Sequence, residues 1–233
     1  LLGGGLLVVA FVHEVKQLAA GPWKLEWVGS LRTLVKVPGM VPLFLLAIVS
    51  AVLAGGNVTI LSVYVLQLLG PGASGTGTGA FWIGAVAMGL AVSSVISLLL
   101  WGKVLDRIEP ARVLVFATAG ATLTQIPLLF LETPLELVIA RVAFGLGASL
   151  MQPAIVRLLK AYAPRGMDSR AISYSHSFHF IALGMAPFCA GLIGPVFGLR
   201  AYFAITIVFS VFVLALWIRT SGRLRAALSV RHD

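Results

Sequence analysis

The sequence has 233 residues, of which 59% are hydrophobic and only 11% are charged. Its mean hydropathy is +1.03, and a water-soluble domain of this size has too little interior to bury so many apolar side chains. The net charge of +9 is divided into short basic clusters between apolar runs. This distribution is typical of membrane-protein loops and argues against nucleic-acid binding by one basic patch.

The first 40 residues contain no segment that is long enough to span a membrane. Residues 1–12 are apolar but fall short of the ~20 residues that a span needs, and we expect them to be the end of a truncated transmembrane helix. Residues 13–40 are the most polar stretch and predict a cytoplasmic central loop with a short amphipathic helix on the membrane surface. The apolar face of that helix would be formed by Trp27, Leu31, Leu34 and Val35.

Six long apolar segments follow, and none shows the alternating pattern of a β-barrel strand. Each is long enough to cross a ~30 Å hydrocarbon layer as a helix. The sequence therefore predicts an all-α polytopic membrane protein, with a six-helix transmembrane bundle within residues 41–219 and a cytoplasmic tail at 220–233. The predicted spans are residues 41–69, 80–101, 111–131, 135–156, 171–197 and 201–218. Four prolines are expected to kink or interrupt these helices, namely Pro127, Pro153, Pro187 and Pro195.

The basic residues predict the orientation of the bundle. With residues 13–40 in the cytoplasm and the six spans alternating in direction, every Lys and Arg except Arg141 and Arg200 lies in a cytoplasmic segment. An excess of basic residues in cytoplasmic loops is the usual rule for inner-membrane proteins. We therefore predict a multi-pass protein of the plasma (inner) membrane whose C-terminus is cytoplasmic.

The loop after the second span contains Gly102, then Asp106-Arg107 four residues later, and then Arg112. This pattern resembles the loop signature of the major facilitator superfamily, although Glu109 stands where the family usually has Gly. Two further stretches are similar to patterns of the same family. They are Arg141-Val-Ala-Phe-Gly145-Leu-Gly147, and Ala186-Pro187 with Gly191, Gly194 and Gly198-Leu-Arg200.

The resemblance covers essentially the whole chain and is closest to multidrug-efflux-type proton antiporters. It implies that the chain is the C-terminal six-helix half of a twelve-helix fold, with an N-terminal half missing. It also implies secondary transport by alternating access, with proton-coupled export of small amphipathic compounds or drugs. In the loop signature, Gly102, Asp106, Arg107 and Arg112 would form a latch that stabilises one conformational state; the alternative is an ordinary basic loop in which Asp106 pairs locally.

Arg141 lies about six residues inside the fourth predicted span. Together with Gly145, Ala148 and Gln152 it recurs at helical spacing, which favours a small, polar face toward a cavity or a packed helix. The alternative is that Arg141 extends to the outer surface and pairs with Glu132 or Glu136. No acidic residue lies deep in any predicted span, so a coupling carboxylate would have to come from the missing half.

His176 and His179 lie three residues apart within the fifth predicted span. Histidine titrates near neutral pH, so the pair is a candidate for a proton or substrate pathway. Hydrogen bonding between helices is the equally plain alternative, and metal binding is weakly indicated because two histidines lack a third ligand. Asn57 and Tyr64, which continue a seven-residue repeat from Ser50, are further pathway candidates, with interhelical packing as the alternative.

The sequence contains no recognisable nucleotide, zinc or Ser/His/Asp pattern, and we expect neither a cofactor nor an enzyme activity. The predicted partners are a small-molecule substrate, protons, the lipid bilayer and the missing half, and not nucleic acid. Three alternatives to export remain at this point. They are uptake of a sugar or organic acid, a membrane-embedded enzyme, and a helical module that does not itself transport.

Overall fold

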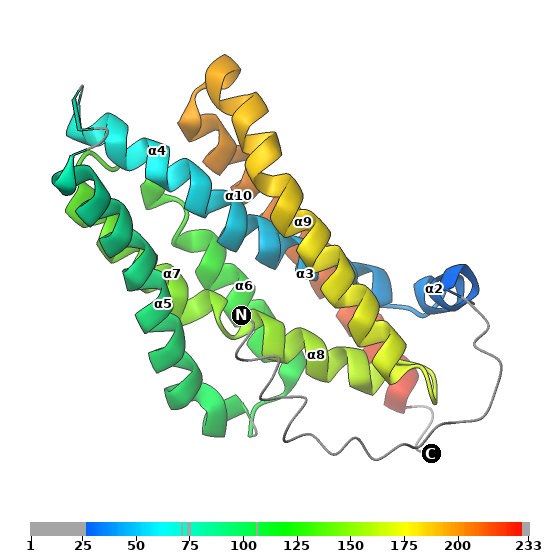
Figure 1. Ribbon diagram of the computed structural model, residues 1–233. Coiled ribbons are helices and arrows are strands. Elements are labelled where there is room, and N and C mark those ends of the chain that lie inside the picture. The colour runs from blue at the N-terminus through cyan, green and yellow to red at the C-terminus, as the bar shows by residue number, and fades with distance from the viewer. Residues whose placement is uncertain (1–26, 71, 74–75, 106, 230–233) are drawn as a thin grey trace, which may run out of the picture.

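The computed structural model describes residues 27–70, 72–73, 76–105 and 107–229 (Figure 1). Every regular element in these ranges is helical, which confirms the all-α prediction. In chain order the elements are α2 (Trp27–Val35), α3 (Met40–Ala51), the π-helical segment η1 (Val52–Gly56), α4 (Asn57–Leu69), α5 (Gly77–Leu105), α6 (Pro110–Leu123), the 3₁₀ segment η2 (Pro127–Leu129), α7 (Pro134–Ala148), α8 (Met151–Tyr162), α9 (Asp168–Phe197) and α10 (Leu199–Ser229).

The described residues contain six helical stretches that are long and apolar enough to cross a membrane. This confirms the prediction of a polytopic helical membrane protein. The largest difference from the predicted bounds is in the fourth stretch, which continues beyond residue 156 because Leu158 and Leu159 are buried against the rest of the bundle. The stretches are Met40–Leu69, Gly77–Gly102, Pro110–Leu129, Pro134–Tyr162, Asp168–Phe197 and Leu199–Ser221.

Three spans are composed of more than one helical segment. The first consists of α3, the wide turn η1 and α4, and the third consists of α6 and the short segment η2. The fourth consists of α7 and α8, which are separated by Ser149 and Leu150. The prediction that prolines kink or interrupt the helices is confirmed for some of them and not for others. Pro153 lies in the first turn of α8, whereas Pro187 and Pro195 lie inside α9, which is continuous through both. In a membrane bundle the hydrogen-bonding groups that a proline frees are often satisfied locally, so a helix can continue through it.

The interior of the bundle is divided into two buried clusters. One joins α3, α6 and α8 with Phe144 and Trp217. The other joins α4, α5 and the first turns of α7 and α10, and contains Tyr202 and Phe203. In Figure 1 the α4–α5 connection and the α9–α10 turn lie toward one end of the bundle, and the α8–α9 turn and the last turns of α10 lie toward the other. The two clusters thus stabilise opposite ends of the same bundle.

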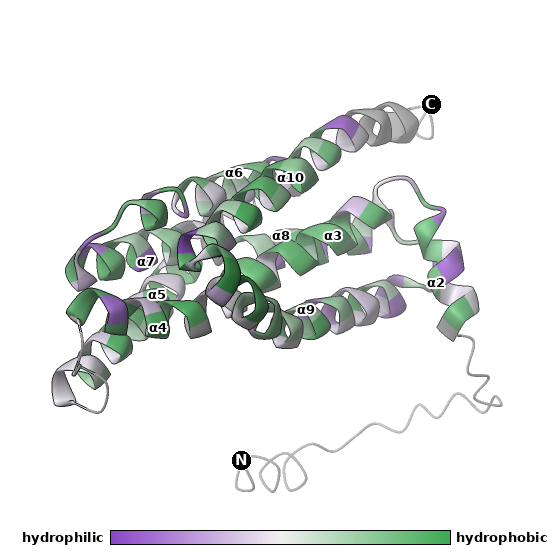
Figure 2. Cartoon of the chain, turned by 90° about the horizontal axis from the view of Figure 1, so that it is seen from above, coloured by the Kyte–Doolittle hydropathy of each residue, from purple (hydrophilic) through white to green (hydrophobic). Residues whose placement is uncertain are grey.

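Helices α5 and α9 leave the most apolar surface exposed. Only 17% of the most apolar window of each span is buried within the chain. Figure 2 shows that hydrophobic residues dominate the spans, whereas hydrophilic residues concentrate near the connections and in α2. Such surfaces suit contact with lipid or with further transmembrane helices.

Helix α2 is the short helix expected within residues 13–40. Leu34 is fully buried and Leu31 packs beside it, whereas Val35 is exposed. The guanidinium of Arg170, near the start of α9, donates a 2.6 Å hydrogen bond to the hydroxyl of Ser30. These contacts hold α2 against the end of the bundle. The truncated helix expected at residues 1–12 and the loop residues before α2 lie outside the described residues.

Candidate functional site

Three polar side chains from different helices meet where two spans are interrupted. Ser50 lies in the last turn of α3, just before η1, and Gln152 is the second residue of α8. His179 reaches them from the middle of α9. We call Ser50, Gln152 and His179 the polar cluster. Because each of them lies inside an apolar span, its polar atoms need partners from neighbouring helices.

The polar cluster is connected by direct hydrogen bonds. The side-chain amide of Gln152 lies 2.9 Å from Ser50 Oγ and 2.7 Å from His179 Nδ1, and one amide proton is available for each. The Ser50 hydroxyl donates to the carbonyl oxygen of Ala47 at 2.8 Å. His179 Nδ1 also lies 3.1 Å from that carbonyl oxygen and 3.2 Å from Ser50 Oγ.

This geometry provides His179 Nδ1 with a partner in either protonation state. When Nδ1 carries no proton, it accepts a hydrogen bond from the Gln152 amide. When Nδ1 is protonated, it donates to the carbonyl oxygen of Ala47, and the Gln152 amide can rotate to offer its oxygen. A half-buried imidazole with a donor and an acceptor at hydrogen-bond distance can therefore accept and release a proton without losing all its partners.

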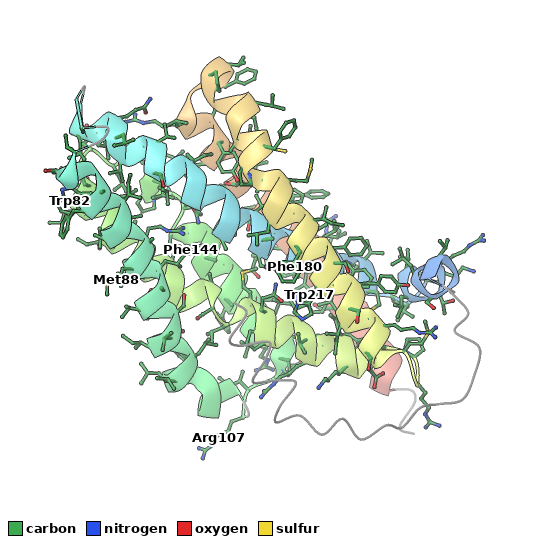
Figure 3. All side chains as sticks on the ribbon, in the orientation of Figure 1. Trp82, Met88, Arg107, Phe144, Phe180 and Trp217 are labelled. Carbon is green, nitrogen blue, oxygen red and sulfur yellow. The ribbon has the colours of Figure 1, made fainter. Side chains whose placement is uncertain are left out.

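His176 is separate from the polar cluster. Its side chain is exposed, and its ring stacks on Phe180 with centroids 6.4 Å apart. Phe180 is labelled on α9 in Figure 3, and it also contacts His179 edge-on at 5.7 Å. The two histidines thus share an aromatic neighbour but have different polar surroundings. Within the described ranges, no three His, Cys, Asp or Glu residues lie close enough to hold a metal ion.

Ser50 and Tyr64, which the sequence assigned to one face, are separated by the π-helical turn. An additional residue in a wide turn rotates the following helix by roughly 100°, the rotation of one helical residue. Tyr64 is buried, and its hydroxyl donates to the carbonyl oxygen of Leu131 at 2.8 Å. Asn57 is the first residue of α4, and its side chain lies outside the described residues.

Arg141 lies in a second polar site, between α4, α5 and α7. Only 1% of this residue is exposed, and its guanidinium carbon lies 4.9 Å from the centre of the Phe144 ring. The Nε and Nη1 atoms are buried and have no hydrogen-bond partner in the described part of the chain. The guanidinium lines a cavity of about 50 Å³ together with Leu61, Ser62, Ile83, Val86 and Ala87.

The pairing of Arg141 with a surface carboxylate is not formed among the described residues. The Glu136 carboxylate accepts hydrogen bonds from the backbone N–H groups of Glu132 and Thr133, at 3.1 and 3.2 Å. Together with the Thr133 hydroxyl it forms a capping box at the start of α7. Glu136 is thus used to begin the helix that carries Arg141.

The small polar face predicted on the fourth span is divided between the two sites. Gly145 follows Arg141 on α7 and lies directly against α5, where an added Cβ would collide with Ser93 Oγ and come within 2.8 Å of the Leu90 carbonyl oxygen. Gln152 lies beyond the interruption and belongs to the polar cluster. The sequence singled out Arg141, Gln152 and His179, but it did not indicate that Gln152 joins His179 and Ser50.

The loop signature is partly described. An added Cβ at Gly102 would meet no atom within 4 Å, so this glycine makes no close helix contact within the described part of the chain. Arg107 is exposed and extends away from the bundle in Figure 3. Arg112 forms a 3.2 Å ion pair with Glu109, the residue that departs from the family pattern. Asp106 lies outside the described residues.

The surface also has a groove between α4 and α9, with a volume of about 320 Å³. Gln67 contributes a polar side chain to it, and Gly191, Gly194 and Pro195 contribute part of the opposite wall. A groove of this size with one polar group suits a small amphipathic molecule. It is separate from the small cavity at Arg141.

The sequence of this chain was compared with family models and with curated proteins. The family model described as Major Facilitator Superfamily matches residues 43–231. The multidrug resistance protein MdtG of Salmonella dublin is 30% identical over 202 residues, which cover 86% of this chain and 49% of that protein. MdtG of Citrobacter koseri is 32% identical over 182 residues, covering 78% and 43%. MdtG of Enterobacter lignolyticus is 29% identical over 220 residues, covering 93% and 52%. The chain thus spans about half the length of these relatives.

Proposed function

We propose that this chain, which belongs to the Major Facilitator Superfamily, supplies transmembrane helices to a proton-coupled exporter of small amphipathic compounds or drugs. The family is one of membrane transporters, which favours transport over a membrane-embedded enzyme. The relatives named above are multidrug resistance proteins, and this supports export rather than uptake of a sugar or organic acid. In this proposal the protein works by alternating access, and the half that completes the transporter pairs with the exposed apolar surface of the bundle.

The observation that carries the proposal is the polar cluster at the two interrupted spans. Interrupted helices near the middle of the membrane often form substrate and ion sites in transporters. Here Gln152 lies at the start of α8, Ser50 lies beside η1, and His179 has hydrogen-bond partners suited to both of its protonation states. We therefore propose that His179 and Gln152 belong to the proton or substrate pathway. Four further residues remain secondary candidates for the same pathway, namely Asn57, Tyr64, Arg141 and His176.

Transport assays in cells that lack their own drug pumps test this proposal. The full-length protein should lower the accumulation of a fluorescent amphipathic cation such as ethidium, and a protonophore should abolish the effect. Higher accumulation in cells that express the protein would instead indicate uptake. Unchanged accumulation for a panel of amphipathic cations, anions and neutral compounds would contradict export.

Substitution of the two histidines tests the proposed pathway. His179→Gln keeps a hydrogen-bonding group but removes the titratable one, so proton-driven efflux should fall at least tenfold while protein level in the membrane stays the same. His176→Gln is the matched variant on the same helix and should have the smaller effect. Wild-type efflux by His179→Gln would mean that the cluster only joins helices. A larger loss in His176→Gln would move the pathway to the exposed histidine.

The loop signature and the orientation complete the proposal. We propose that the end with Arg107, Arg112, Lys160, Arg165 and Arg170 is cytoplasmic, because these exposed basic residues cluster in the connections there. Asp106 would act in a latch with the neighbouring basic residues. Asp106→Ala should then slow transport without reducing membrane insertion, and a normal transport rate in this variant would contradict the latch. Labelling of single cysteines introduced at Arg165 and at Arg200 in intact cells would test the orientation.

A further inference from the structure

The cavity at Arg141 has the features of a built binding site. It lies between α4, α5 and α7, and its walls are apolar except for Ser62 and the guanidinium. Only 1% of Arg141 is exposed, and its guanidinium carbon lies 4.9 Å from the centre of the Phe144 ring, which covers one face of the group. Ala87, which is exposed, forms part of the wall, so the cavity is connected to the surface between α4 and α5.

Among the described residues, no negative charge compensates the guanidinium in this cavity. Arginine stays protonated in proteins, and a buried charge without a partner is strongly destabilising. The N–H groups on Nε and Nη1 are buried, and no described residue accepts a hydrogen bond from them. The nearest acidic residue along the chain, Glu136, is committed to the helix cap, and the ion pair found among the described residues is that between Arg112 and Glu109, on a different helix end.

Size and charge restrict what the cavity accepts. By a measure in which one water needs about 10–15 Å³, a cavity of about 50 Å³ has room for an ion of a few atoms and excludes a drug-sized molecule. One guanidinium neutralises one negative charge. A divalent anion would leave an excess negative charge between apolar walls, where the electrostatic penalty is largest.

We propose that Arg141 and the cavity beside it form a binding site for one small monovalent anion, of the size of chloride or formate. The anion accepts hydrogen bonds from the unbonded N–H groups and neutralises the buried charge. The Ser62 side chain provides the polar part of the opposite wall. This site is distinct from the polar cluster and does not depend on the direction or substrate of transport.

Thermal unfolding of the purified full-length protein in detergent tests the site. Sodium gluconate, whose anion is too large for the cavity, sets the baseline at constant ionic strength, and chloride or formate replaces it stepwise. The melting temperature should rise saturably by about 2–4 °C with either small anion, and sulfate should not reproduce the rise. A melting temperature that does not respond to chloride or formate would overturn the proposal.

Two variants locate the effect. Arg141→Gln should abolish the rise, whereas Arg200→Gln, which removes an exposed arginine at the start of α10, should retain it. If Arg141→Gln retains the full rise, the anion acts elsewhere and the proposal is wrong. If Arg141→Gln does not fold, Ala87→Leu decides, because it narrows the cavity and leaves the guanidinium in place. A full rise in Ala87→Leu would then overturn the proposal, and a reduced rise would support it.

Discussion

The polar cluster and the Arg141 cavity both place polar groups within apolar spans, but they satisfy those groups differently. In the polar cluster, Gln152, Ser50 and His179 hydrogen-bond to one another across three helices. At Arg141, the neighbouring helices supply a ring face and apolar walls, and two guanidinium nitrogens have no hydrogen-bond partner in the part of the chain that the structure describes. The comparison indicates that the cluster is complete within this chain, whereas the cavity needs an added group.

The largest effect is expected at Gly145, because it sets the close contact between α7, which carries Arg141, and α5. Gly145→Leu would force a side chain into Ser93 and the Leu90 carbonyl oxygen and separate α7 from α5. Overpacking of this kind costs about 3 kcal/mol or more when backbone must move. We expect little folded protein, as measured by monodispersity in size-exclusion chromatography. Gly184→Leu, at a position with no atom within 4 Å of an added Cβ, is the control and should remain folded.

Removal of the charge at Arg141 should have the opposite sign to disruption of the polar cluster. Arg141→Met has similar length and no charge, so in a buffer without small anions it should be more stable than wild type by about 1–3 kcal/mol. Chemical unfolding in detergent measures the difference. Chloride should reduce that gap because it stabilises only the wild type. A loss of stability in both buffers would mean that the arginine has a partner in the complete protein.

Disruption of the polar cluster should be destabilising. His179→Leu removes the acceptor of the Gln152 amide and leaves that amide with one partner fewer. Hydrogen bonds between membrane helices contribute about 0.6–1.7 kcal/mol each, and we expect a loss of about 1–2 kcal/mol in the free energy of unfolding. His176→Leu, on the exposed side of α9, should change it by less than about 0.5 kcal/mol. Equal losses in the two variants would contradict the distinction between the histidines.

The smallest effect is expected for a single hydrogen bond that lies outside both sites. Tyr64→Phe keeps the ring packed edge-on against Phe203, at 6.2 Å, and removes the hydroxyl that donates to Leu131. The expected loss is about 0.6 kcal/mol, and the carbonyl oxygen near the end of a span can bind water instead. Unfolding and transport should both be measured. A strong transport defect with near-normal stability would indicate that Tyr64 takes part in the substrate or proton pathway.

The positions of the spans could be predicted from the sequence because length and hydropathy determine them almost alone. The candidate site residues could also be identified from the sequence, because a polar side chain stands out within an apolar segment. Which of these residues contact one another could not be predicted, because this depends on how each helix is rotated about its own axis in the bundle. The π-helical turn at η1 is the clearest case. At this turn Gly55 lies directly against the side chain of Leu183 in α9. A sequence pattern within one helix cannot predict a contact between residues that are so far apart in the chain.

The choice between the two hypotheses for Arg141 also required the tertiary structure. From the sequence, extension to the surface and orientation toward a cavity were equally compatible with a position near the start of a span. The outcome depends on Glu136, whose carboxylate is bound in the helix cap, and on α4 and α5, which enclose the guanidinium. Neither effect is visible in the spacing of α7 alone.

The contact between α5 and α7 has a consequence for how a bundle of this kind can change shape. Gly145 brings the two backbones together, and the Ser97 hydroxyl donates to the Leu146 carbonyl oxygen at 2.7 Å just beyond it. The close backbone contact at Gly145 and the hydrogen bond at Ser97 oppose sliding and rolling of the two helices against each other, so we expect α5 and α7 to move together. We therefore expect a rearrangement that opens the protein to occur at the boundaries between this pair and the other helices, and a covalent link between α5 and α7 should leave that motion intact.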